Sequence, residues 1–140
     1  MDVFETAMSI AHEALGDVKD KQGKPAIRHT IEVMRRLPTP DLQLVGILHD
    51  VVEDSEKTIE DLRAAGVRED ILAAVDAITK RPSESYKKYI ERVKLNKLAR
   101  QVKVADISHN MSIPRLFHLE EKEVVRLTKK YYKAYQILRR

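Results

Sequence analysis

The sequence has no cysteine and no tryptophan, and it has only four glycines and five prolines in 140 residues. Without cysteine the chain forms no disulfide, offers no thiolate to zinc and has no thiol nucleophile. Any metal site must therefore use oxygen and imidazole ligands. The few glycines, and the rarity of alternating β-branched residues, argue against a β-sheet and favour an all-α fold.

Long apolar runs are also absent. No run approaches the roughly 20 residues of a membrane-spanning helix, and the amino terminus MDVFETAMS has early acids where a signal peptide has basic residues. We therefore expect a soluble, cytoplasmic protein. Its length suffices to bury a core, and no linker or repeat divides it, so we expect a single domain over residues 1–140.

Acidic residues are scarce in two segments. Residues 80–103 contain nine lysines or arginines against Glu84 and Glu91, and residues 124–140 contain six basic residues and no acid. Such blocks are typical of a phosphate-binding surface or of a solvated helix face. The net charge of +4 is too small to decide between these interpretations.

Apolar residues recur at helical spacing along most of the chain and predict a bundle of seven or eight helices. Prolines, glycines and capping residues mark the expected boundaries, among them a capping box at Thr58 and Asp61 and a cap at Asn96. The expected helices cover residues 1–18, 25–37, 40–54, 59–65, 71–78, 86–93, 97–110 and 120–138.

The segment LVGILHDVVED, residues 44–54, is apolar on almost every side but contains His49, Asp50, Glu53 and Asp54. An ionised carboxylate in an apolar interior costs several kcal/mol unless it is paired, hydrogen-bonded or bound to a metal. On one continuous helix these four side chains would share a broad face. A divalent metal ion is the simplest partner for all of them.

Further candidate ligands lie in two other helices. His29 belongs to the second expected helix, and Asp106 interrupts the apolar run VKVADI as Asp50 interrupts VGILHDVV. Two imidazoles and two carboxylates would balance a divalent ion and leave positions open to water. The alternative is a charge cluster at a helix end with His49 as an ordinary core histidine. Contributions from three separate helices favour the metal site.

The order His29, His49-Asp50, Asp106 resembles the H...HD...D pattern of the HD-domain metal-dependent phosphohydrolases. HDVVEDSEKTIEDL resembles the HDxxED segment and the following helix of the RelA/SpoT-type (p)ppGpp hydrolase domain. The segments SIAHEA, AIRHTIEVMRRL and KVADISHNM resemble other motifs of that domain. The similarity extends from about residue 7 to residue 110, and the short chain is similar to small stand-alone HD proteins. It implies an all-α HD-domain bundle.

This resemblance implies a role for each polar residue of the pattern. Glu53 and Asp54 match the acidic pair that orients and activates the attacking water. The cofactor is expected to be one divalent ion, with manganese ahead of Fe, Zn, Co, Ni and Mg. The implied metal ligands are His29, His49, Asp50 and Asp106.

Substrate contacts are less well defined. Asn110 matches a substrate-contacting asparagine of the family, and Lys21 matches the lysine of an Arg-Lys pair near the guanine base, whereas Asp20 stands in place of the arginine. His109 is expected either to contact phosphate or to cap its helix. Cations from the basic block 80–103 suit phosphate oxygens. The predicted substrate contacts are Lys21, Asn110, His109, Lys103 and Arg92.

The predicted function is hydrolysis of a phosphate or pyrophosphate ester of a nucleotide by a metal-activated water. The first substrate to consider is (p)ppGpp, which would yield pyrophosphate and GDP or GTP. One alternative is a hydrolase of another nucleotide, such as a nucleoside monophosphate. Another is a non-catalytic module that binds nucleotide or nucleic acid and retains a metal. We expect a nucleotide-like small molecule as partner, disfavour nucleic acid and membrane, and leave a homo-oligomer open.

Overall fold

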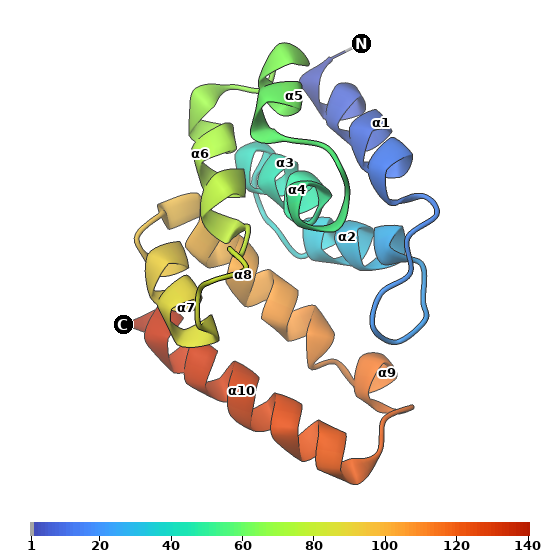
Figure 1. Cartoon of the computed structure of the whole chain (residues 1–140), viewed down its shortest axis with the longest axis vertical. Coiled ribbons are helices and arrows are strands. Elements are labelled where there is room, and N and C mark those ends of the chain that lie inside the picture. Colours follow the sequence, from blue (N-terminus) through green and yellow to red (C-terminus); the bar gives the residue numbers. More distant parts are fainter. Residues whose placement is uncertain (1) are drawn as a thin grey trace.

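The computed structural model describes residues 2–140 and confirms the all-α class (Figure 1). In the described part of the chain the only extended pairing is an isolated bridge between Lys19 and Pro25. No helix within residues 2–140 has both the length and the apolar character needed to span a membrane. The helices are α1 (Val3–Leu15), α2 (Ala26–Arg35), α3 (Pro40–Leu48), α4 (Val51–Asp54), α5 (Ile59–Ala64), α6 (Glu69–Ile78), α7 (Tyr86–Lys94), α8 (Lys97–Asn110), α9 (Ile113–Leu116) and α10 (Glu121–Arg139).

The predicted helix over residues 40–54 is interrupted. α3 ends at Leu48, and α4 begins at Val51 after a turn formed by His49 and Asp50. The ring Nδ1 of His49 donates a 2.6 Å hydrogen bond to the Gly46 carbonyl, which a continuous helix would offer to the Asp50 N–H. The expectation of one regular helical face over residues 49–54 was therefore wrong. This break and the single-turn helix α9 explain why the structure has more helical segments than the sequence predicted.

The other helix boundaries agree with the expected ones to within three residues. The Thr58 side chain accepts from the Asp61 N–H while the Asp61 carboxylate accepts from the Thr58 N–H, so the predicted capping box is confirmed. Asn96 caps α8 by accepting from the Ala99 N–H, also as predicted. Short-range polar patterns thus set where these helices begin.

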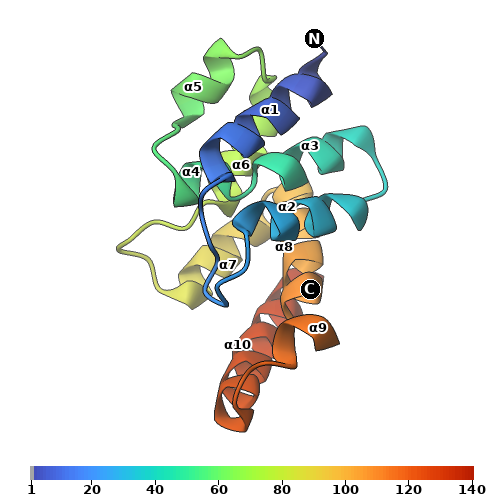
Figure 2. The same cartoon turned by 90° about the vertical axis from the view of Figure 1, so that its right-hand side faces the viewer.

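α3 lies at the centre of the bundle and packs against α1, α2, α6 and α8. Six of its nine residues are buried, including the whole stretch from Leu44 to Leu48. Gly46 permits the close approach of α2, because a Cβ at this position would lie 3.4 Å from the Cα of Met34 in that helix and 2.7 Å from Leu37 Cδ1 just beyond it. Figure 2 shows α9 and α10 at one end of the molecule and α1 and α5 at the other. This packing brings the end of α3 against α2 and α8.

Candidate active site

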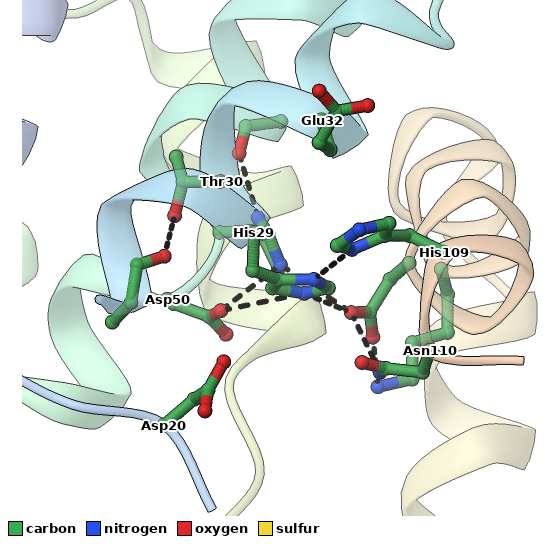
Figure 3. Close-up of polar contacts among 12 residues, drawn as sticks. Asp20, His29, Thr30, Glu32, Asp50, His109 and Asn110 are labelled. Carbon is green, nitrogen blue, oxygen red and sulfur yellow. Dashed lines mark hydrogen bonds and ion pairs between the residues drawn. The ribbon is translucent and has the colours of Figure 1, made fainter. Parts of the chain in front are cut away.

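Three helical regions bring the four predicted metal ligands together. His29 comes from α2, His49 and Asp50 from the turn between α3 and α4, and Asp106 from α8. Figure 3 labels His29 and Asp50 of this group. Only 6% of His29, 3% of His49 and 5% of Asp106 is exposed, while Asp50 is partly exposed. Such burial requires that each polar side chain has a strong polar partner. We refer to these four residues as the HHDD cluster.

Distances within the HHDD cluster suit a shared ion. His29 Nε2 lies 2.7 Å from Asp106 Oδ1 and 3.8 Å from Asp50 Oδ2, and His49 Nε2 lies 3.2 Å from Asp50 Oδ2 and 3.6 Å from Asp106 Oδ1. Ligand atoms of His29, His49 and Asp50 all lie within 4.8 Å of one another. Donor atoms about 2.1 Å from one ion are about 3 Å apart when adjacent. The spacing is therefore close to that of a ligand set.

Both histidines can present an unprotonated Nε2. His49 Nδ1 bonds the Gly46 carbonyl, and its Nε2 is buried with no hydrogen-bond partner among residues 2–140. His29 Nδ1 lies 2.7 Å from Nδ1 of His109. Histidines that bind metal commonly donate the second ring N–H to a protein acceptor, which fixes their tautomer. The residues present thus fit a divalent ion held by nitrogen and oxygen.

His109 lies behind His29 and does not line the pocket described below. The two rings stack with their centroids 4.9 Å apart. Burial, and then the charges of His29, Arg115 and Arg36, lower the pKa of His109 to about 4. At neutral pH its Nδ1 is therefore free to accept a hydrogen bond from Nδ1–H of His29. This geometry gives His109 an orienting position rather than the predicted phosphate contact.

The acidic pair at the end of α4 is exposed to the pocket, and its two members differ. Glu53 Oε1 accepts a 2.7 Å hydrogen bond from the Lys80 backbone N–H. The Asp54 carboxylate has no such bond from any residue that the structure describes. Desolvation raises the pKa of Asp54 to about 6, and repulsion from Asp50 and Glu53 adds to this shift. Asp54 is thus a carboxylate whose environment favours uptake of a proton.

A pocket of about 670 Å³ opens over the HHDD cluster. Cationic side chains share its lining with these residues, and their charges act on one another: burial, and then the neighbouring Lys21, Lys103, Arg126 and Lys80, lower the pKa of Lys130. The hydroxyl of Tyr86 is buried in this pocket without a hydrogen-bond partner within residues 2–140. The pocket cations are Lys19, Lys21, Lys80, Lys103, Arg115, Arg126 and Lys130. Such a pocket suits an anion of several charges.

The predicted substrate residues divide into two groups. Lys21, Lys103 and Asn110 line the pocket, although Lys103 Nζ also pairs with Asp106 Oδ2 at 2.7 Å. Arg92 does not line it. The Arg92 guanidinium bonds Glu84 and the carbonyls of Ala77 and Thr79 at the end of α6, so its donors are used there. The structure therefore corrects the assignment of Arg92 to the substrate.

Several pocket residues were missed from sequence. Lys80 lies in the first basic block and Arg126 and Lys130 lie in the second, so these blocks were the available signal. Arg115 lies outside both blocks. Only tertiary structure brings it to the pocket, where its guanidinium pairs with Asp20.

The comparisons with known proteins agree with this geometry. No protein-family model matches the chain. A GTP pyrophosphokinase of Streptomyces coelicolor is 30% identical over 86% of this chain, which spans only 16% of that relative. A solved structure of a metazoan ortholog of SpoT, which hydrolyses ppGpp and plays a role in starvation responses, aligns with a TM-score of 0.82 and 21% identity. That alignment covers 99% of this chain and 86% of the other.

This chain has the HD-domain fold. The predicted resemblance to the RelA/SpoT-type domain is confirmed. The HD domain also contains a His-His-Asp group that could hold a metal ion. Which metal it prefers, and the roles of the individual residues, stay predictions.

Metal binding to this HD domain is expected to release protons. Burial alone would lower the pKa of His49, but the charges of Asp50 and Asp106 outweigh burial and raise that pKa well above its ordinary value. A raised pKa favours the protonated His49 ring in the ion-free protein, and an ion at Nε2 must displace that proton. We therefore expect the binding of Mn²⁺ to release protons.

This release can be measured by calorimetry in buffers with different ionisation enthalpies. The apparent affinity should weaken as pH falls, because the proton competes with the ion. The His118→Ala variant, which changes an exposed histidine of the α9–α10 turn, should show the same proton release. Binding that is independent of pH would contradict the assignment of His49 as a ligand.

Proposed function

We propose that this HD domain is a metal-dependent phosphohydrolase that cleaves a phosphate or pyrophosphate ester of a nucleotide, with ppGpp as the leading substrate. The observation that carries the proposal is the HHDD cluster beside a pocket that several cationic side chains also line. A metal site suits the phosphate to be cleaved, and the cationic side chains suit the remaining phosphate charge.

The two relatives support the choice of substrate. The metazoan SpoT ortholog with this fold hydrolyses ppGpp, and the Streptomyces relative is a GTP pyrophosphokinase. Both descriptions concern phosphorylated guanine nucleotides. The first substrates to examine are therefore guanine nucleotides with a pyrophosphate group.

The proposed chemistry is attack of water on phosphorus. When bound, a divalent ion supplies Lewis acidity that lowers the pKa of water and offsets phosphate charge. Asp54 takes the proton of the attacking water, since its raised pKa of about 6 suits a general base that works near neutral pH. Glu53 holds the loop that begins at Lys80 against the pocket through its bond to the Lys80 N–H.

Cations and one hydroxyl hold the substrate in this proposal. Lys80, Lys130 and Lys21 face the phosphate groups, and their mutual repulsion is relieved when an anion enters. The buried Tyr86 hydroxyl gains a phosphate oxygen as acceptor, which removes the cost of an unpaired donor. These contacts strengthen as charge develops on the departing phosphate.

Purified protein loaded with Mn²⁺ is expected to convert ppGpp to GDP and pyrophosphate. EDTA should abolish the reaction and added Mn²⁺ should restore it, because the HHDD cluster has no other source of Lewis acidity. The measurement is chromatography of products from a panel of ppGpp, pppGpp, GTP, GDP and nucleoside monophosphates, each assayed with and without the ion.

The products separate this proposal from its alternatives. Orthophosphate from a nucleoside monophosphate, with ppGpp untouched, would indicate another nucleotide hydrolase. Metal-loaded protein that binds ppGpp but cleaves no member of the panel would instead indicate a non-catalytic binding module.

A further inference from the structure

The loop between α1 and α2 is built around the carboxylate of Asp20. Oδ1 of Asp20 accepts from the backbone N–H groups of Gln22 at 2.9 Å and Lys24 at 3.0 Å. The Asp20 N–H donates to the Lys24 carbonyl, and Gly23 takes the positive φ of 76° that closes the turn. One carboxylate oxygen thus shapes the loop, and the other oxygen remains for a second contact.

The second contact joins this loop to α9. Asp20 Oδ2 lies 2.6 Å from Arg115 Nη1, and each side chain is about 15% exposed or less. Burial raises the pKa of Asp20, but the bonds from Arg115, Lys24 and Gln22 outweigh it and leave that pKa below its ordinary value. The pair therefore stays ionised, although its members are 95 residues apart in the chain.

Arg115 continues the contact to the HHDD cluster. Its Nη2 donates to Asn110 Oδ1 at 3.2 Å, and Asn110 Nδ2 donates to Asp106 Oδ1 at 3.3 Å. An arginine can only donate, so Arg115 fixes the Asn110 amide with its oxygen toward α9 and its nitrogen toward Asp106. Figure 3 labels Asn110 and Asp20 in the same region as His29 and Asp50.

We propose that Arg115 is a positioning residue that ties the 18–25 loop to the metal-binding cluster and thereby sets the affinity for the nucleotide. The inference rests on the proposed function. Val18, Lys19, Asp20, Lys21 and Gln22 of the loop all line the pocket, as do Asn110 and Arg115. The tie therefore fixes the distance between one wall of the pocket and the HHDD cluster. A buried ion pair by itself adds little stability over an apolar pair, so this arrangement favours a role in positioning.

The test compares Arg115→Gln, Asp20→Asn and the double variant. Asparagine at position 20 can keep the Oδ1 acceptor of the turn, but it replaces the charged Oδ2 acceptor of Arg115 with an NH2 donor. We expect each single variant to raise KM for ppGpp by about tenfold or more, with kcat within about threefold and one bound ion per chain. The KM of the double variant should be no higher than that of the single variant with the higher KM, because both changes break the same contact.

Two further variants serve as controls. Arg115→Lys keeps the charge but cannot bridge Asp20 and Asn110 together, so it should recover part of the affinity. Arg68→Gln removes an arginine that pairs with Asp41 and Asp70 on the exposed surface, and it should leave KM unchanged. Unchanged KM in Arg115→Gln, or fully multiplicative effects in the double variant, would overturn the proposal.

Hydrogen exchange of amides 18–25, measured without nucleotide, tests the tie independently of activity. Faster exchange of this segment in Arg115→Gln and Asp20→Asn is expected even if the wild-type protein cleaves none of the panel, which would refute only the proposed function. Equal exchange in wild type and variants would refute the tie itself.

Discussion

His49→Ala is expected to lose the bound ion and to lower kcat/KM by about 1,000-fold or more, since the charge stabilisation by an active-site ion is worth several kcal/mol and about 1.4 kcal/mol equals a factor of ten. The buried Nε2 of His49 has no hydrogen-bond partner within residues 2–140, so the substitution removes a metal-ligand atom that is already in place. Ion content is measured by elemental analysis and activity with ppGpp. Asp50→Ala should have the same two effects.

The matched control is His118→Ala, which removes an exposed histidine of the α9–α10 turn. This variant should keep one ion per chain and full activity. Circular dichroism confirms that each variant is folded before its activity is compared. A His49→Ala protein that lacks the ion yet hydrolyses ppGpp at the wild-type rate would refute the metal-dependent mechanism.

Asp54→Asn is expected to lower kcat by about 10²- to 10⁴-fold, the usual contribution of a general base. It should keep the bound ion, because Asp54 is not one of the proposed ligands, and this separates it from His49→Ala. Asparagine preserves the shape of the side chain but cannot accept the proton. The measurement combines ion content with kcat for ppGpp.

The pH dependence gives an independent check on Asp54. Its carboxylate is the active form, so wild-type kcat should fall as pH drops through the pKa of Asp54. This pKa is about 6 without an ion, and a nearby divalent cation shifts it lower. The acidic limb should disappear in Asp54→Asn. The Glu53→Gln side chain can still accept from the Lys80 N–H, so kcat should fall less than about tenfold. A larger fall in kcat would indicate that Glu53, and not Asp54, is the general base.

The HHDD cluster was predictable because its members break a strong apolar pattern. Asp50 and Asp106 each stand within a run of core residues, and the burial of His29, His49 and Asp106 is confirmed. The helix boundaries were predictable for a similar reason, since caps such as Thr58 and Asn96 act within one turn. Both kinds of signal lie within a few neighbouring residues.

Two features could not be read from such short stretches. Arg92 lies in a basic block like the pocket cations, but the fold places it against Glu84 and the end of α6. Asp20 stands where the resemblance implies an arginine, and the fold brings the guanidinium of Arg115 to it from α9. The turn at His49 was missed although it is local, since its ring bonds back to Gly46 only three residues earlier.

The sequence by itself determined the all-α class, the helix positions and the residue types able to bind a metal, because periodicity, caps and buried polar residues act over short distances along the chain. Tertiary structure alone decided which cations reach the pocket and how the Asp20 loop is held against α9. The physical reason is that these contacts join residues far apart in the chain, such as Asp20 and Arg115, so they exist only after the helices have packed.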